Sequence, residues 1–325
     1  MRRGKAIAGV LGAVMAAMLG CGAVAAAAPP VQVSGTVPCP GGDFTKCDNS
    51  GLSDPRVRGV ETLDIRYEFS SADTGVTWGT DRNVTAAGAW EGTWAGVMYS
   101  GPVNDISAWL RGSGAYAGLT YYYGSVGPDA RATVKGLIYA GSPPPGQFTV
   151  PEGPLMVESE PAVVVRGRAT CTFASGVSWS SCADQVPDPR VTGRETVSLQ
   201  STELGGQAAL LWGTKVVHGP DGTWEGVWNG VRYPDGTYRM NGYLTGSGAY
   251  AGWVYWFSQT GTGRPSFALD GLIYRGSPVP TLAATTTVPA SNGPRGPDEA
   301  PALVLIGLAA AVAAGAVLRR RARSD

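Results

Sequence analysis

Two glutamates, Glu91 and Glu225, occupy matching places between tryptophans, each in a Trp-Glu-Gly-x-Trp segment. A carboxyl group beside apolar rings can have a raised pKa and can then act as a general acid or base. These two residues are therefore candidate catalytic groups for an isomerase or a hydrolase. The alternative, which we favour, is that both side chains point outward, opposite the tryptophans, or pair with an arginine.

Aromatic side chains form a second group of candidates. Exposed aromatic rings bind sugars and apolar ligands. The ligand-binding candidates are aromatic residues that lie near the two Gly-Ser-Gly turns and are not identical in the two halves of the chain. They are Trp109, Tyr122, Tyr123, Trp253 and Trp256. Six of the ten tryptophans recur at matching positions, and for these we favour core packing: Trp78, Trp90, Trp94, Trp212, Trp224 and Trp228.

Other chemistry has little support in the sequence. His218 is the single histidine, so a serine–histidine–acid triad would depend on it alone. We interpret His218 as a surface loop residue, because its counterpart in the other half of the chain is Val84. Neither a histidine cluster, a phosphate-binding loop nor a dinucleotide motif occurs. The sequence therefore predicts no metal and no cofactor, and we favour a protein without enzymatic activity.

An internal repeat organises the chain. Asp54-Pro55-Arg56-Val57 returns 134 residues later as Asp188-Pro189-Arg190-Val191, and Gly-Ser-Gly-Ala-Tyr-Ala-Gly occurs at both 112–118 and 246–252. About a third of the aligned positions are identical. Such self-similarity indicates two copies of one structural unit. The predicted segments are repeat 1 at 31–142, a Pro-rich connector at 143–162, repeat 2 at 163–277 and a stalk rich in Pro, Thr and Ala at 278–301.

Within each repeat the pattern is that of β-strands. Trp90, Gly92 and Trp94 alternate with polar or small residues, which places them on one face of a strand. Glycine-rich turns separate runs that suit about seven or eight short strands in each repeat. The predicted fold is all-β, with two tandem small antiparallel barrels, because closure removes exposed edges; a sandwich is the alternative. We also expect Arg56 to pair with Glu61, and the matching residues of repeat 2 to do the same.

The Gly-Ser-Gly-Ala-Tyr-Ala-Gly turn, the Trp-x-Gly-x-Trp strand and the closing Gly-Leu-Ile strand resemble one family. They are similar to the allene oxide cyclase and dirigent-type barrel group, including its bacterial members of unknown function. This resemblance implies small antiparallel barrels with apolar interiors and covers both repeats. It carries no catalytic residue over to this sequence, because the enzymes' pockets do not match it position by position. The cysteines and the membrane tether also depart from the plant enzymes, so cyclase activity is not implied.

The N-terminal residues predict export. Arg2, Arg3 and Lys5 precede an apolar stretch, and the small-residue run 23–28 follows it. This order is typical of a cleaved secretory signal peptide, here residues 1–28. An uncleaved anchor is the alternative, and Cys21 lies in a segment loosely similar to a bacterial lipidation site.

The C-terminal residues predict a membrane anchor. Residues 302–318 are apolar and uncharged, and four arginines follow within residues 319–325. A run of this length can span a membrane as one helix, and basic residues favour the cytoplasmic side. We therefore predict a single-pass protein of the cell membrane, with the repeats outside and a basic tail inside.

Charge and cysteine usage agree with an extracytoplasmic body. Residues 29–300 contain 18 basic and 24 acidic residues, a balance that argues against a nucleic-acid partner. Four cysteines beyond Cys21 form one pair in each repeat, and an even number in an exported chain indicates disulfides. The predicted bonds are Cys39–Cys47 and Cys171–Cys182.

These features together favour a tethered, non-enzymatic cell-surface protein that binds an apolar or glycan ligand in or near a barrel. Two copies on one chain would raise avidity for a multivalent target. A structural spacer of the cell envelope is one alternative. An isomerase or hydrolase that uses a barrel carboxylate is the other.

Overall fold

The computed structural model describes most of the two repeats and their connector: residues 28–40, 47–71, 73–99, 103–128, 131–151, 153–157, 160–173, 179–262 and 266–281. The predicted signal peptide up to residue 27, the transmembrane segment 302–318, the basic tail and most of the stalk lie outside these residues. Within the described part of the chain, no helix is both long enough and apolar enough to cross a bilayer.

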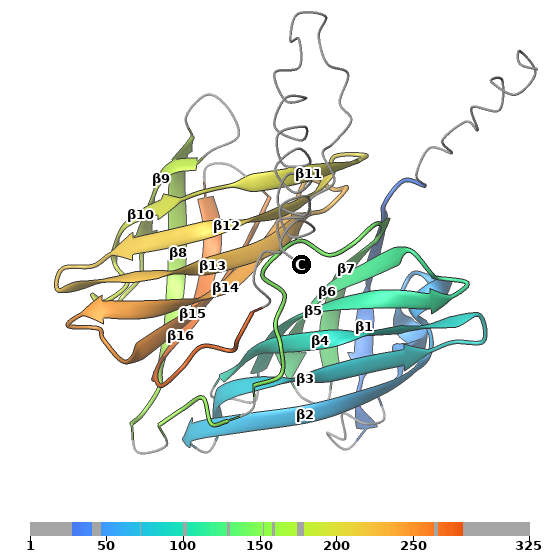
Figure 1. The fold of residues 1–325 in the computed structure, drawn as a ribbon, viewed down its shortest axis with the longest axis horizontal. Helices are drawn as coiled ribbons and strands as arrows, with labels where there is room; N and C mark the ends of the chain where they lie inside the picture. Colours follow the sequence, from blue (N-terminus) through green and yellow to red (C-terminus); the bar gives the residue numbers. More distant parts are fainter. Residues whose placement is uncertain are drawn as a thin grey trace, which may run out of the picture. The chain divides into compact units, whose positions relative to one another are not determined.

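Repeat 1 forms a seven-stranded antiparallel sheet in the order β1-β7-β6-β5-β4-β3-β2 (Figure 1). Its strands are β1 (Val31–Pro38), β2 (Val60–Ser71), β3 (Thr74–Val84), β4 (Gly88–Tyr99), β5 (Val103–Gly114), β6 (Leu119–Pro128) and β7 (Arg131–Ala140). Two short 3-10 helices lie between β1 and β2, namely η3 (Asn49–Gly51) and η4 (Pro55–Val57). A single bridge between Asp48 and Val60 connects this segment to β2.

Repeat 2 forms a nine-stranded antiparallel sheet, and eight of its strands close into a barrel. Its sheet runs β10-β9-β8-β16-β15-β14-β13-β12-β11, and an additional pairing of β10 with β12 completes the circle. The strands are β8 (Val163–Phe173), β9 (Trp179–Gln185), β10 (Gly193–Val197), β11 (Gln200–Gly205), β12 (Ala208–His218), β13 (Gly222–Arg232), β14 (Tyr238–Gly248), β15 (Trp253–Gly261) and β16 (Ser266–Arg275). The predicted all-β antiparallel class is confirmed.

The repeats differ at β9, because the described residues of repeat 1 form no matching strand that would close its sheet. In repeat 1, β1 ends at Pro38, and Pro40 follows it. Proline has no backbone N–H, so neither residue can donate a hydrogen bond to a further ladder. In repeat 2 the matching strand, β8, continues to Phe173 and pairs with β9.

Both predicted disulfides are present. Cys171 and Cys182 are directly opposite each other on β8 and β9. Cys39–Cys47 joins the end of β1 to the residue before the Asp48 bridge. In each repeat the disulfide therefore links the first strand to the segment that follows it in the chain.

The repeated Gly-Ser-Gly-Ala-Tyr-Ala-Gly turn connects β5 to β6 and β14 to β15. Gly114 and Gly118 have φ values of +63° and +82°, which glycine adopts without strain. The turn places the Tyr116 ring on Trp90, with the two rings stacked and their centroids 5.0 Å apart. Trp224 and Tyr250 repeat this stack at 5.0 Å in repeat 2. The motif thus fixes a tryptophan in the core of each repeat.

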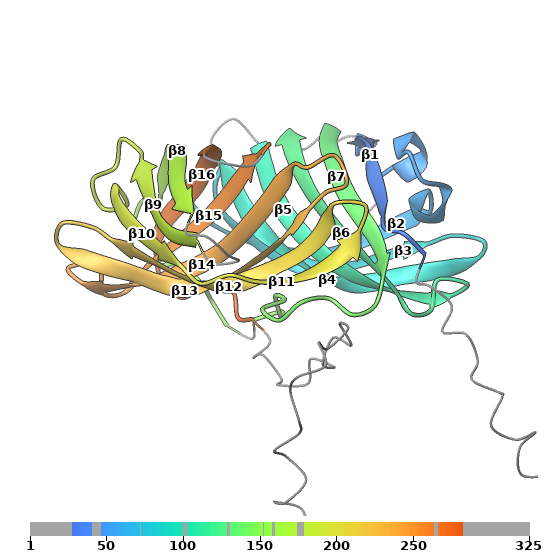
Figure 2. The ribbon, with the colours of Figure 1, turned by 90° about the horizontal axis from the view of Figure 1, so that it is seen from above.

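The repeats pack against each other through their outer faces, along strands that can be followed in Figures 1 and 2. On one side, Trp78 and Tyr99 from β3 and β4 belong to one apolar cluster with Trp256 and Tyr274 from β15 and β16. On the other side, Trp109, Tyr122 and Tyr139 of repeat 1 form a cluster with Leu210 and Tyr233 of repeat 2. Several central strands therefore have two buried faces.

The two clusters are related by the sequence repeat itself. Tyr99 corresponds to Tyr233, and Trp256 corresponds to Tyr122. Tyr99 and Trp256 are in contact in one cluster, with centroids 6.4 Å apart, and their counterparts Tyr233 and Tyr122 belong together to the other cluster. In a two-fold interface, if residue i contacts j then j contacts i. The two copies consequently form a pseudo-two-fold interface within one chain.

A buried ion pair lies on this pseudo-two-fold axis. Arg239 pairs with Asp105, its own counterpart 134 residues earlier, and its guanidinium also donates to Ser107 Oγ at 3.2 Å and Ile106 O at 3.0 Å. Gly124 makes room for it, because a Cβ there would lie 2.1 Å from Arg239 Nε. The pair therefore sits in a buried, close-fitting site between the repeats.

Candidate functional site

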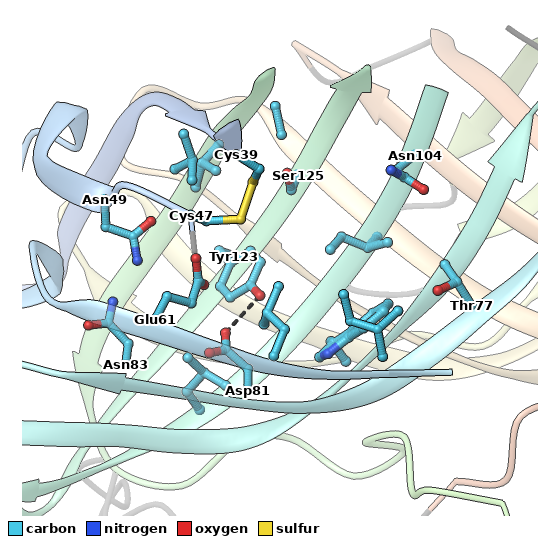
Figure 3. Close-up of a pocket in the computed structure, with 18 of the residues that line it drawn as sticks. Cys39, Cys47, Asn49, Glu61, Thr77, Asp81, Asn83, Asn104, Tyr123 and Ser125 are labelled. Atoms are coloured by element: carbon cyan, nitrogen blue, oxygen red, sulfur yellow. Dashed lines mark hydrogen bonds between the residues drawn. A yellow bond between two sulfur atoms is a disulfide. The ribbon is translucent and has the colours of Figure 1, made fainter. Parts of the chain in front are cut away.

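Repeat 1 contains a cavity of about 500 Å³ against the inner face of its sheet (Figure 3). Most of its lining is apolar, and a group of polar side chains gathers on one side. The polar residues are Asn49, Glu61, Thr77, Asp81, Asn83, Asn104, Tyr123 and Ser125, and the apolar ones include Leu63, Ile65, Trp94, Ile106, Leu110 and Val134. An apolar chamber with a few convergent polar groups is the usual form of a small-molecule site.

Neighbouring strands bring two carboxyl groups together in this cavity. Glu61 on β2 is opposite Asn83 on β3, and Leu63 is opposite Asp81. Glu61 and Asp81 are thus diagonal neighbours on the same face, since alternate residues of a strand share a face. Both residues are buried, and Asp81 is only 2% exposed.

The carboxyl pair holds protons that exposed acids would lose. Burial, together with the charge of Asp81, raises the pKa of Glu61 well above its ordinary value. Burial also raises the pKa of Asp81 to about 7, against opposing hydrogen bonds from Tyr123 and Glu61. The charge of Asp81 contributes to the raised pKa of Glu61, so the two groups titrate as a pair.

Hydrogen bonds hold the polar side chains around the carboxyl pair. Tyr123 Oη donates to Asp81 Oδ2 at 2.8 Å, and Asn83 Nδ2 donates to Val57 O at 2.8 Å. Asp81 Oδ1 and Asn83 Oδ1 accept no other hydrogen bond within the described chain. Buried polar atoms normally have a partner. Two buried acceptors beside the cavity therefore lack a donor, and one of them, Asn83 Oδ1, lies against Gly59.

Repeat 2 has a different arrangement at the matching positions. Glu61 corresponds to Glu195, but Asp81 corresponds to Lys215. Lys215 Nζ lies 2.6 Å from Glu195 Oε2 and 4.0 Å from Asp184 Oδ2, and its side chain is 1% exposed. The second repeat therefore carries its own buried cation between two acids.

Larger side chains also fill the space that is open in repeat 1. Thr77 and Ala132 correspond to Leu211 and Phe267, and both of these are buried in the core of repeat 2. Asn104 and Ser125 correspond to Tyr238 and Gln259, and the Tyr238 ring meets Phe267 with centroids 6.0 Å apart. These substitutions distinguish the two interiors in polarity and in volume.

The candidate catalytic glutamates lie elsewhere. Glu91 is on the outer surface, with its side chain 57% exposed, and Arg82 Nε lies 2.6 Å from Glu91 Oε1. Glu225 is exposed on β13. Neither lines the cavity, because β4 and β13 direct their tryptophans inward at the neighbouring positions. The expected Arg56–Glu61 pair is wrong: Arg56 binds Asp54, and in repeat 2 Arg190 likewise binds Asp188 rather than Glu195.

The aromatic candidates are divided among three locations. Trp109, Tyr122 and Trp256 are buried in the interface between the repeats. Tyr123 lines the cavity. Trp253 is half-buried next to the turn of repeat 2, with the guanidinium groups of Arg190 and Arg275 over its ring. His218 is exposed at the end of β12.

Glu61 and Asp81 were not predicted as a site from the sequence. One signal was available, because Asp81 and Lys215 are charged residues of opposite sign at the same place in the repeat. Comparisons of the chain with models of protein families, with curated proteins and with solved structures give no match. The site therefore has to be interpreted from its own geometry.

Proposed function

We propose that repeat 1 binds one small, largely apolar molecule in its cavity, with a polar end of that molecule at Glu61 and Asp81. The observation that carries this proposal is an apolar chamber of about 500 Å³ that contains a buried carboxyl pair. Closely packed interiors hold few voids larger than a water molecule. A space of this size therefore suits a ligand better than it suits a purely structural domain.

The cellular setting is part of the same proposal. The signal-peptide pattern of residues 1–28 and the apolar segment 302–318 favour an exported protein anchored by one helix. In this view both repeats are related to the barrel group that includes allene oxide cyclases and dirigent-type proteins, with the described part of repeat 1 forming an open sheet. Repeat 1 is the receptor for the ligand, and repeat 2 supports it. The predicted glycan ligand has less support, because the aromatic candidates Trp109, Tyr122 and Trp256 are buried between the repeats.

An acid–base enzyme is the second candidate function. The observation that favours it is again the carboxyl pair, since a carboxyl with a pKa near 7 can both give and accept a proton at neutral pH. The catalytic groups would then be Glu61 and Asp81 rather than Glu91 and Glu225. An isomerase would turn over its ligand, whereas a binding protein would release it unchanged, so chemical analysis of a recovered ligand separates the two.

Filling the cavity tests the binding function. The variant Thr77→Leu/Ala132→Phe introduces into repeat 1 the residues that repeat 2 has at the same positions. We expect the full chain to bind 1-octanol, measured by calorimetry, and this variant to bind it at least tenfold more weakly without loss of thermal stability. The control is Glu91→Gln, which removes a charge outside the cavity and should leave octanol binding unchanged. Equal octanol binding by wild type and the filled variant would contradict the proposal.

A further inference from the structure

The interior of repeat 2 shows how this fold accommodates an ammonium group. Lys215 Nζ lies between Glu195 and Asp184, and it also sits over the face of Phe257, 4.0 Å from the ring centroid. A cation over an aromatic face is attracted by the electrons of the ring. Two acids and one aromatic ring thus surround a buried amine.

Repeat 1 keeps two of these three groups and lacks the amine. Glu61 takes the place of Glu195, and the ring of Tyr123 takes the place of Phe257. The second acid of the cavity is Asp81, on the strand position from which Lys215 projects. Among the described residues that line the cavity, none is basic. The site therefore has two acids and an aromatic ring around an open space.

Two buried acceptors beside this space lack a donor. Asp81 Oδ1 and Asn83 Oδ1 accept no hydrogen bond within the described chain, and both residues are buried. A primary ammonium group has three N–H donors and no acceptor. Its donors suit the carboxylates of Glu61 and Asp81, the two acids that line the cavity. A carboxylate ligand would instead add negative charge to an acidic site.

We propose that the ligand of repeat 1 is a primary amine with an apolar body, whose ammonium group takes the place that Lys215 Nζ occupies in repeat 2. This inference rests on the proposed function, because it names the ligand class of the same cavity. The apolar body lies along Leu63, Ile65 and Ile106, which line the rest of the chamber. Each repeat would then hold one buried ammonium group, supplied by the chain in repeat 2 and by the ligand in repeat 1.

Binding of an ammonium group also displaces a proton. In the empty site the Glu61–Asp81 pair retains a proton because both groups are buried and face each other, with Tyr121, Tyr123 and the Arg56-paired Asp54 as the other ionisable groups nearby. When the ammonium group enters, it favours the ionised carboxylates, and the retained proton leaves to solvent. The affinity for the amine should therefore rise with pH from 5.5 to 8.

Three probes of equal chain length separate this inference from the proposed function. We expect the full chain to bind n-octylamine roughly 100-fold more tightly than 1-octanol at pH 7.5, and to bind octanoate more weakly than either. Calorimetry in buffers of different ionisation enthalpy should show net release of up to one proton for each octylamine bound. If octanol binds as tightly as octylamine, the cavity function stands and the amine class is wrong. If none of the three binds, both proposals fail.

Variants at Asp81 provide a second test. Asp81→Lys installs the arrangement of repeat 2, so octylamine binding should be lost while the circular dichroism spectrum stays that of wild type. Asp81→Asn keeps the shape of the side chain and should lower octylamine affinity at least tenfold with little change for octanol. Asp81→Asn separates the amine effect from misfolding if the lysine variant does not fold. Unchanged octylamine affinity in a folded Asp81→Asn protein, or the absence of proton release in wild type, would overturn the inference.

Discussion

Two carboxyl groups in one apolar cavity cannot both ionise without a large free-energy cost, since no basic residue of the described lining offsets the charge. The raised pKa values of Glu61 and Asp81 mean that the pair keeps a proton. In repeat 2 the same problem is solved with Lys215, which lies against both acids. The single exchange of Asp81 for Lys215 therefore changes the charge, the proton count and the free volume of an interior together.

The carboxyl pair should make stability fall as pH rises. The pKa of Asp81 is about 7 in the folded chain, and the pKa of Glu61 is also raised, so the folded state holds protons that the unfolded chain releases. Their contribution is fully present below the unfolded values near pH 4 and is lost as pH rises through about 7. Relative to Asp81→Asn, we expect wild type to lose about 2–4 kcal/mol of unfolding free energy between pH 4.5 and 8. Urea unfolding measures this difference, and parallel pH profiles for the two proteins would contradict it.

At this scale the sequence predicts residue types better than residue partners. Glu61 is five positions from Arg56, which made a local ion pair a reasonable expectation. Arg56 instead binds Asp54, whose Oδ1 also accepts the Arg56 backbone N–H at 2.9 Å. That local turn occupies the arginine, and Glu61 enters the interior with Asp81. Contacts between side chains on different strands depend on register, which the sequence alone does not determine.

Strand periodicity predicts the elements well where only one face is buried. The alternation around Trp90 and Trp94 places both rings in the core, as expected. Continuous apolar runs are harder to interpret, because a strand that is buried on both faces loses its alternation. In β7, Ile138 points into the core of repeat 1 while Leu137 and Tyr139 contact repeat 2. The run was predicted as a strand, but its second buried face was not.

The disulfides should affect ligand binding unequally. They close short loops, with sequence separations of 8 and 11 residues, so loss of either should cost roughly 2–3 kcal/mol. Cys39 and Cys47 also line the cavity, whereas Cys171–Cys182 lies in the other repeat. We expect Cys39→Ala/Cys47→Ala to weaken octylamine binding and Cys171→Ala/Cys182→Ala to leave it unchanged. Calorimetry at a temperature where both variants are folded checks this, and equal affinities in the two variants would argue against a role for the first bond.

Across the whole molecule, the repeats are joined by much more than the connector predicted at 143–162. Their outer faces bury aromatic clusters on both sides of the Asp105–Arg239 pair. The connector adds to this contact, since the Glu68 carboxylate of β2 accepts the backbone N–H groups of Leu155 and Met156. The repeat was evident in the sequence. Aromatic residues that pack one repeat against the other, however, have the same sequence pattern as aromatic residues that bind a ligand. For this reason Trp109, Tyr122 and Trp256 were candidates for binding.

Removing one partner of the axial ion pair should be costly. Asp105→Ala leaves the Arg239 guanidinium buried without its counter-ion, and we expect a loss of about 3–5 kcal/mol of unfolding free energy. The double variant Asp105→Met/Arg239→Met removes both charges and should recover most of that loss. Guanidinium chloride unfolding of the single and double variants measures the coupling. Additive losses in the double variant would show that the pair does not act as a unit.

The axial pair also has a consequence for how the two halves can change over evolutionary time. Two identical copies would place like residues opposite each other at this point, Asp against Asp or Arg against Arg, and like charges repel. The two charges attract only when one copy carries Asp and the other carries Arg. Each repeat therefore packs more favourably against the other repeat than it would against an identical copy of itself. A substitution that enlarges one interior need not be tolerated in the other, and one half can acquire a ligand while the other remains a closed scaffold.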